Sequence, residues 1–147
     1  MAIKHAPEQE LERPKVGIGV MIIKDGKVLL GKRKGSHGAG EYAFPGGHLQ
    51  YMESFENCAK RETREETGME IRNVRFLHLL NLKEYPPKHY VHMGLIADWE
   101  HGEPRTMESD RMGTWNWYDI DKLPKPLFKT IPSCIEAYKT GKNYWDA

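Results

Sequence analysis

The chain has 147 residues, a length that predicts one domain with a single hydrophobic core. Its 22 Lys and Arg residues nearly balance its 21 Asp and Glu residues, and the net charge of +1 argues against binding to a nucleic-acid polymer or to an anionic membrane surface. No apolar run is long enough to cross a membrane and the polar N-terminus lacks a signal-peptide pattern, so we expect a cytoplasmic protein. The two cysteines, Cys58 and Cys134, indicate neither a disulfide scaffold nor a zinc site.

The first part of the chain predicts a flexible arm followed by a β-hairpin. Residues 1–14 are polar, and we expect them to form the arm. Residues 16–24 are almost continuously apolar and rich in β-branched side chains, which is typical of a central strand covered on both faces. The dipeptide at residues 25–26, Asp-Gly, predicts a tight turn into a second strand over residues 27–33.

A glycine-rich, basic loop at residues 34–41 precedes Gly46 and Gly47, which predict a further turn. The loop matches neither the phosphate loop of nucleotide kinases nor the dinucleotide fingerprint. Two roles stay open for it. It could be a plain connector, or its place before the Gly-Gly turn could let it cover a polyphosphate.

Residues 54–67 predict a helix that carries the most informative side chains of the sequence. A step of roughly 100° per residue places Glu62, Glu65 and Glu66 on one side of this helix. Three apolar side chains project in nearly the same direction: Phe55, Cys58 and Ala59. Three polar or basic side chains point away: Asn57, Lys60 and Arg64. The carboxylates therefore continue the face that we expect to be buried, and they need a positive partner.

That partner could be a basic side chain or a metal ion. Arg61 and Arg64 could form ordinary salt bridges with the carboxylates. A hard divalent cation prefers several oxygen ligands, which three carboxylates and the backbone carbonyls of the Gly-Gly turn would offer. The surroundings of the helix favour the cation.

The second half of the chain predicts three strands and a short helix. Residues 71–82 and 89–99 predict two strands joined by a loop at residues 84–87. Residues 114–118 predict another strand, and after a Pro-rich break a helix is expected near residues 133–138. Strands on both sides of a helix, with a second helix at the end, predict an α/β layered domain.

Histidines and aromatic residues of this half are candidates for binding or for the core. His89 and His92 lie three apart in a predicted strand and point to opposite faces, which argues against a shared metal site. Trp115 and Trp117 share one face and are predicted as core. Phe128 could be core or a platform on which a base stacks, and the sequence alone favours core.

The segment around the predicted helix resembles the signature of the Nudix hydrolases. That signature sets glycine, glutamate and arginine at fixed spacing, followed by paired glutamates, a glycine and an aliphatic residue. The positions that match it here are Gly47, Glu53, Arg61, Glu62, Glu65, Glu66, Gly68 and Met69. Thr63 departs from the aliphatic residue usual at its position, but its methyl group can still pack.

The resemblance implies the Nudix fold, a mixed β-sheet sandwiched between α-helices, and a pyrophosphohydrolase that uses Mg²⁺ or Mn²⁺. By matched position, Glu62, Glu65 and Glu66 would bind the metal together with the carbonyl of Gly46. The structural positions of the signature would brace the loop and the helix: Gly47, Glu53, Arg61 and Gly68. Substrate contacts implied by the resemblance are Arg33, Gly46, Gly47, His48, His92, Leu127 and Phe128.

The resemblance covers nearly the whole chain and is closest to MutT-type members of the family. It implies hydrolysis of a nucleoside triphosphate, oxidised ones included, to a monophosphate and pyrophosphate. A nucleotide sugar, a dinucleoside polyphosphate, a prenyl diphosphate and a catalytically silent nucleotide-binding module stay open, although the intact acids favour an enzyme. A homodimer also stays open. His92 stands where such relatives have Thr or Ser, so the preferred base is not fixed.

The general base is a further open question. Glu65 or Glu66 could orient and deprotonate the attacking water. The family also uses acids outside the signature, and the candidates in this chain are Glu108 and Asp110.

Overall fold

A long central strand, β1 (Lys15–Lys24), organises the sheet, as its apolar sequence predicts. The structure is a computed structural model that describes residues 12–146. Residues 1–11 of the predicted arm lie outside the described residues, and residues 12–14 are exposed and precede the first strand. Asp25 and Gly26 both have positive φ, and they form the predicted turn into β2 (Lys27–Arg33).

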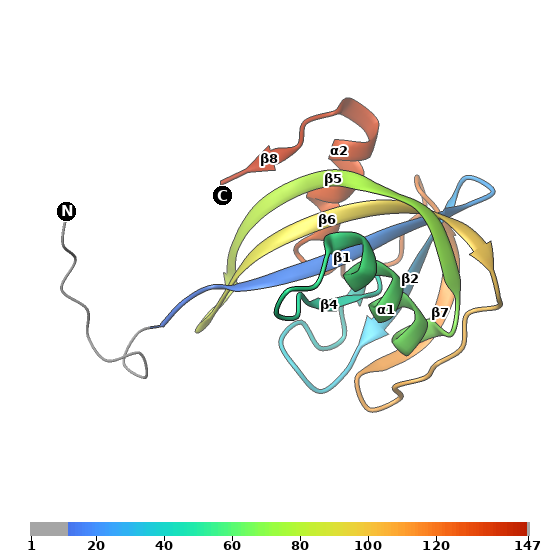
Figure 1. The fold of residues 1–147 in the computed structure, drawn as a ribbon, viewed down its shortest axis with the longest axis horizontal. Coiled ribbons are helices and arrows are strands. Elements are labelled where there is room, and N and C mark those ends of the chain that lie inside the picture. The colour runs from blue at the N-terminus through green and yellow to red at the C-terminus, as the bar shows by residue number, and fades with distance from the viewer. Residues whose placement is uncertain (1–11, 147) are drawn as a thin grey trace.

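The sheet is mixed and has eight strands within the described residues (Figure 1). β1 pairs in parallel with β6 (Lys88–His101) and antiparallel with β2 and with β4 (Gly46–His48). β6 is also antiparallel to β5 (Glu70–Tyr85). The remaining strands lie toward the edges: β3 (Tyr42–Ala43), β7 (Met112–Asp119) and β8 (Tyr144–Trp145).

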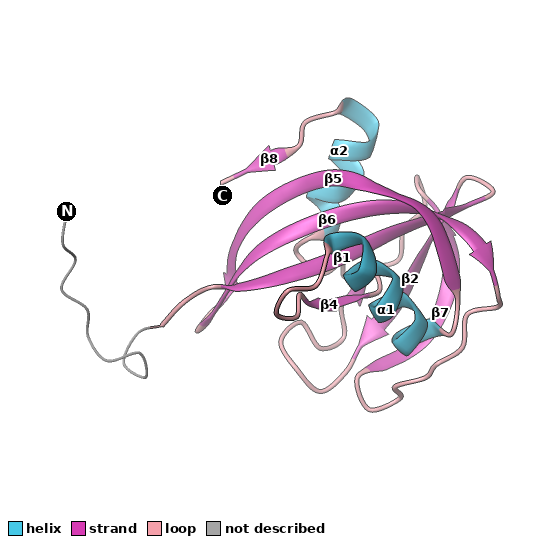
Figure 2. Ribbon diagram, in the orientation of Figure 1, coloured by secondary structure: helices cyan, strands magenta, loops and turns pink. Residues whose placement is uncertain are grey.

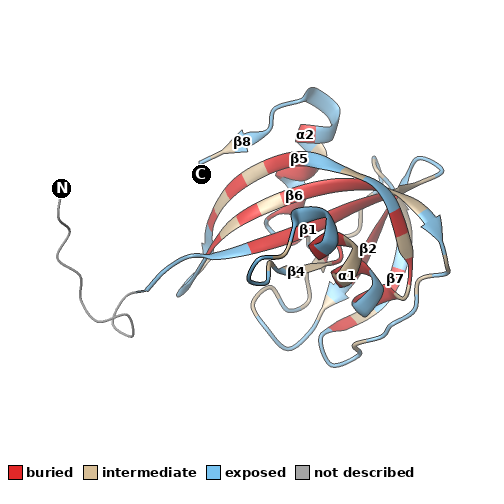
Figure 3. Cartoon of the chain, in the orientation of Figure 1, coloured by how far each residue is buried: buried red, intermediate tan, exposed pale blue. Residues whose placement is uncertain are grey.

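Two helices, α1 (Phe55–Thr67) and α2 (Ile131–Thr140), cover the sheet (Figure 2). Cys58 and Ala59 of α1 join a core cluster with Ile18 and Val20 of β1, whereas α2 packs in a second cluster with Met21 of the same strand. Because successive strand residues point to opposite faces, the two helices lie on opposite faces of the sheet. The buried stretches of β1, β5 and β6 run between them (Figure 3). Neither of these helices has the length and apolar composition needed to span a membrane.

Three local predictions are wrong in whole or in part. The loop predicted at residues 84–87 is shorter: Pro86 and Pro87 form the turn, whereas β5 continues to Tyr85, which pairs directly with Lys88 and packs beside two core clusters. Gly46 and Gly47 are not a turn but part of strand β4, where glycine permits close backbone approach: a Cβ on Gly46 would collide with the carbonyl oxygen of Ile18. Phe55 was predicted on the buried face of the helix but is exposed, because it is the first residue of α1.

Candidate active site

Capping and one ion pair fix the helix that carries the carboxylates. α1 begins after Ser54, whose Oγ accepts a hydrogen bond from Asn57 N at 3.1 Å, and it ends at Gly68 with a left-handed φ of 76°. Glu53 pairs with Arg61 through Nε–Oε2 at 2.7 Å and Nη2–Oε1 at 3.0 Å. These hydrogen bonds lower the pKa of Glu53 to about 2. The pair ties the preceding loop to α1, which agrees with the bracing role implied by the family signature.

The three carboxylates expected to bind metal lie in different surroundings. Glu62 and Glu66 are buried, whereas the side chain of Glu65 is 45% exposed. Arg61 Nη1 donates to Glu62 Oε1 at 3.0 Å and to Glu65 Oε1 at 2.9 Å. Glu66 Oε1 accepts a hydrogen bond from the backbone N–H of Gly46 at 2.7 Å. The predicted buried side of the helix is therefore correct for Glu62 and Glu66, and Glu65 lies at its edge.

Burial raises the pKa of both inner carboxyls. The pKa of Glu62 rises to about 7 because desolvation and repulsion from Glu65 outweigh the attraction of Arg61. The pKa of Glu66 rises to about 8 because desolvation outweighs the hydrogen bond from Gly46. Two buried carboxyls with too little positive charge around them favour a bound cation.

The chemistry of these ligands fits a hard divalent cation, because all of them are oxygen atoms at a desolvated site. Within residues 12–146, however, no three His, Cys, Asp or Glu side chains are arranged to hold a metal ion. Nη1 of Arg61 instead lies between Glu62 and Glu65, at 3.0 Å and 2.9 Å from their carboxylate oxygens. A cation bound here would have to replace this one nitrogen, while Nε and Nη2 of Arg61 stay on Glu53.

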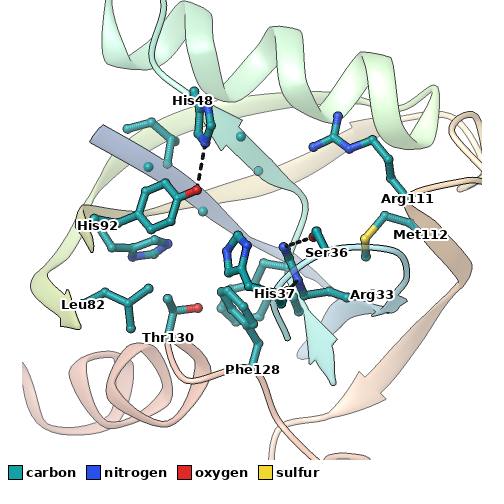
Figure 4. Close-up of a pocket in the computed structure, with 18 of the residues that line it drawn as sticks. Arg33, Ser36, His37, His48, Leu82, His92, Arg111, Met112, Phe128 and Thr130 are labelled. Atoms are coloured by element: carbon teal, nitrogen blue, oxygen red, sulfur yellow. Dashed lines mark hydrogen bonds between the residues drawn. The ribbon is translucent and has the colours of Figure 1, made fainter. Parts of the chain in front are cut away.

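A cavity of about 260 Å³ opens beside the carboxylates, with Glu66 in its wall (Figure 4). We call this cavity the aromatic cavity, because one of its sides is built of stacked rings. His37 stacks on Tyr90 with centroids 5.4 Å apart and planes at 22°, and it lies 5.8 Å from Phe128. Phe128 in turn stacks on Tyr85 at 4.9 Å. Such a wall suits a flat ligand ring.

Arg33 lines the aromatic cavity, where a phosphate contact was expected, but two of its nitrogens hold the glycine-rich loop. Nε donates to the carbonyl of His37 at 3.0 Å, and Nη2 donates to Ser36 Oγ at 3.1 Å. The guanidinium also lies 4.3 Å from the ring centroid of Phe128. The loop at residues 34–41 is therefore part of the cavity wall and more than a connector.

His92 also lies in the cavity wall, on β6. Its ring covers Gly19, where a Cβ would stand 2.8 Å from Nε2. The side chain is buried, and its Nδ1 has no hydrogen-bond partner. Burial and the neighbouring His78 lower the pKa of His92 to about 3, so the imidazole is neutral. His48 lies nearby and contacts the hydroxyl of Tyr90 through Nε2 at 3.3 Å.

Phe128 is a core residue, as the sequence favours, and its position also leaves the base-stacking interpretation open. It is 7% exposed and belongs to the core cluster under α2, and its ring also lines the aromatic cavity. Leu127 packs against the same cluster but does not line the cavity.

A second, more open cavity of about 290 Å³ contains Glu62 and Glu65, and we call it the carboxylate cavity. The loop after β6 contributes the acids proposed outside the signature. Neither Glu108 nor Asp110 lines either cavity. Glu108 is half-buried and its charge raises the pKa of Glu66, whereas Asp110 is exposed. Of these two acids, Glu108 is therefore the better candidate.

Several cavity residues were not predicted from the sequence. They come from four separate segments and belong to no motif: His37, Lys88, Tyr90, Arg111 and Thr130. The one available signal was the position of His37 in the glycine-rich loop, next to the predicted turn.

Residues 13–138 of the chain match the NUDIX domain family, a match that covers α1, most of α2, the carboxylates and the aromatic cavity. The chain belongs to the NUDIX domain family. The expected Nudix fold, a mixed sheet between helices, is confirmed. The same fold occurs in a MutT NUDIX hydrolase from Burkholderia pseudomallei, whose crystal structure gives a TM-score of 0.81 at 34% identity over 86% of this chain and 98% of that one.

The NUDIX chain is also similar in sequence to two longer proteins. It is 37% identical over 111 residues to the oxidized purine nucleoside triphosphate hydrolase of Danio rerio, over 71% of this chain and 66% of that protein. It is 28% identical over 123 residues to the NAD-capped RNA hydrolase NudC of Chromobacterium violaceum, over 82% of this chain and 45% of that protein. The NUDIX chain therefore spans between about half and two thirds of these relatives.

Proposed function

We propose that the protein is a divalent-cation-dependent pyrophosphohydrolase that converts a nucleoside triphosphate, oxidised purine nucleotides included, to a monophosphate and pyrophosphate. One observation carries this proposal: Glu66, a carboxylate of the family signature, is also a wall residue of the aromatic cavity. A base held in that cavity would bring its phosphates to the carboxylates. The relatives named above agree with a phosphorylated nucleotide as substrate.

The reaction needs little covalent chemistry from the protein. A water oxygen attacks a phosphorus atom, the bridging P–O bond breaks, its electrons leave with the pyrophosphate, and the water proton passes to a carboxylate. Mg²⁺ or Mn²⁺, held by Glu62, Glu65 and Glu66 with the carbonyl of Gly46, would neutralise the charge on the diphosphate oxygens. Glu66 is our first candidate for the base, with Glu65 and Glu108 as alternatives.

The remaining substrate contacts divide between the two ends of a nucleotide. Gly47 and His48, beside the carboxylates, would contact the phosphates, with Arg33 using its remaining nitrogen. His92 and Phe128 would contact the base. His92 lines the aromatic cavity and its buried Nδ1 has no hydrogen-bond partner, which gives it the chemistry to affect which base is preferred.

A dinucleotide with a central diphosphate, such as NAD⁺, is the second candidate. The carboxylate cavity, which is lined by Glu62 and Glu65, would give space to the second nucleoside. The similarity to NudC of C. violaceum supports including this class.

A substrate panel tests the proposal. Purified protein with Mg²⁺ is given nucleoside triphosphates, an oxidised purine triphosphate, NAD⁺, a nucleotide sugar and a prenyl diphosphate, and products are separated by anion-exchange chromatography. We expect pyrophosphate and a monophosphate from triphosphates, and no reaction in excess EDTA. Full activity in EDTA would remove the metal from the proposal. Binding of nucleotides by calorimetry without any hydrolysis would show a silent binding module instead.

A further inference from the structure

The aromatic cavity and the carboxylate cavity meet at three residues, Gly47, His48 and Arg111. Within the described part of the chain, Arg111 is the one Lys or Arg side chain that lines both cavities. Figure 4 shows it reaching into the aromatic cavity from the side opposite His92. A ligand with its base in one cavity and its phosphates in the other must pass this guanidinium.

Arg111 also has hydrogen-bonding capacity to spare. Its side chain is 55% exposed, and it donates to Glu108 Oε1 from Nη1 at a long 3.3 Å. An arginine carries five N–H donors, so most of them remain available to a ligand. Its charge lowers the pKa of Glu62 and of Glu66, so it adds positive charge at the carboxylates.

The other arginines of the two cavities are more firmly held by the protein. Arg61 is bound to three carboxylates through all of its guanidinium nitrogens. Arg33 holds the glycine-rich loop through Nε and Nη2. Lys88, whose Nζ lies 3.2 Å from Nδ1 of His37, lines the aromatic cavity alone. Of the arginines that line the cavities, Arg111 makes the fewest hydrogen bonds to the protein through its side chain.

We propose that Arg111 is a phosphate-binding residue that grips the substrate where its phosphate chain crosses from the aromatic cavity to the carboxylates. The inference rests on the proposed function. The planar guanidinium fork can bind two phosphate oxygens at once, which a lysine cannot do. Because Arg111 lies beyond the family signature, on a loop that ends at β7, no sequence motif marks it.

The test compares Arg111→Gln and Arg111→Lys with Arg105→Gln, a matched control on the same loop whose side chain lines neither cavity. Binding of inorganic pyrophosphate with Mg²⁺ is measured by calorimetry, and kcat/KM is measured on the best triphosphate. Because charge-assisted hydrogen bonds are lost, we expect Arg111→Gln to weaken both by roughly tenfold to a hundredfold. Arg111→Lys should recover part of each loss, and Arg105→Gln should match the unchanged protein.

The two readouts separate this inference from the proposed function. Suppose that the unchanged protein hydrolyses no nucleotide, but that Arg111→Gln binds pyrophosphate more weakly than the unchanged protein does. The inference then stands and the proposed reaction fails. If triphosphates are hydrolysed and Arg111→Gln behaves like Arg105→Gln in both assays, the inference is overturned and the reaction stands. Absence of pyrophosphate binding to the unchanged protein would also overturn the inference. Circular dichroism confirms that each variant is folded.

Discussion

Glu65 and Glu66 are neighbours in the sequence, yet the fold places them in opposite surroundings. Glu66 is buried, accepts the N–H of Gly46 and lines the aromatic cavity. Glu65 is 45% exposed and is held by Nη1 of Arg61. A charge in the dry, fixed position is worth more to a reaction than a charge that water already screens. We therefore expect Glu66 to contribute more to the proposed reaction than Glu65.

Replacing Glu66 by glutamine tests this assignment, because the amide keeps the shape and can still accept the N–H of Gly46. We expect Glu66→Gln to lower kcat by about 10² or more, and Glu65→Gln to lower it less. Glu56→Gln is the control, since Glu56 lies on the same helix in an exposed pair with Lys60. Steady-state kinetics on all three variants decides the order. An effect of Glu66→Gln no larger than that of Glu56→Gln would remove Glu66 from the reaction.

At the scale of single residues, helical spacing predicted the buried side of α1 well where the helix packs on the sheet. Cys58, Ala59, Glu62 and Glu66 are all buried there. Spacing failed for Phe55, at the end of the helix, because a helix end can project past the element it covers. The position of Arg111 could not be predicted from the sequence, because the two cavities that it lines form only when distant segments meet.

At the scale of elements, the contact between strand β4 and helix α1 decides where the carboxylates lie. β4 pairs with β1, and Gly47 sits directly against Glu62: a Cβ there would collide with the carboxylate. The colliding atoms are the far end of a flexible side chain. At Gly46, by contrast, a Cβ would collide with the backbone carbonyl of Ile18, which cannot move without disturbing the sheet.

The two glycines should therefore respond differently to the same substitution. We expect Gly47→Ala to fold but to lose at least about tenfold in kcat, because Glu62 is pushed from its position. Gly46→Ala should instead lower the free energy of unfolding by about 1–3 kcal/mol or more through overpacking. Urea denaturation and kinetics on both variants separate the effects. Gly113→Ala, where a Cβ makes only ordinary contacts, is the control. Full activity in Gly47→Ala would contradict the argument.

Element prediction succeeded where a periodic pattern or a defined turn was long enough to read. The strand pair around Asp25 and Gly26 and the helix after Ser54 were predicted closely. The strands β3, β4 and β8 were missed because two or three residues carry no period. Gly46 and Gly47 were misread because glycine serves close backbone approach as well as turns.

At the scale of the whole molecule, the sheet gathers histidines that lie far apart in the sequence. Burial lowers the pKa of each of four imidazoles, which come from the glycine-rich loop, β4, β5 and β6: His37, His48, His78 and His92. The layered α/β architecture was predictable from the order of elements, but this gathering was not, since it depends on strand order and on the parallel pairing of β1 with β6.

The buried histidines contribute to the free energy of unfolding in a way that depends on pH. The pKa of His92 is about 3 in the folded protein, against about 6.5 in an unfolded chain. As pH falls below about 6.5, the unfolded state binds a proton that the folded state does not, so folding stability is full above that pH and decreases below it. His37, with a folded pKa of about 4, acts in the same direction.

Glu62 and Glu66 act in the opposite direction, because their pKa values rise to about 7 and about 8 and the folded state keeps protons that an unfolded carboxylate releases. The prediction therefore concerns a difference between two proteins. Relative to the unchanged protein, His92→Gln should remove one histidine's part of the pH dependence between pH 6.5 and 4.5, up to about 1.4 kcal/mol per pH unit. Urea denaturation at several pH values gives the slope directly. Leu80→Ala is the control, because Leu80 is a buried residue paired with His92 across the sheet and carries no charge. It should lower stability by the same amount at every pH, whereas the difference in free energy of unfolding between His92→Gln and the unchanged protein should change with pH. An unchanged slope in His92→Gln would show that the imidazole is protonated in the folded protein, and the neutral His92 assumed in the cavity would be wrong.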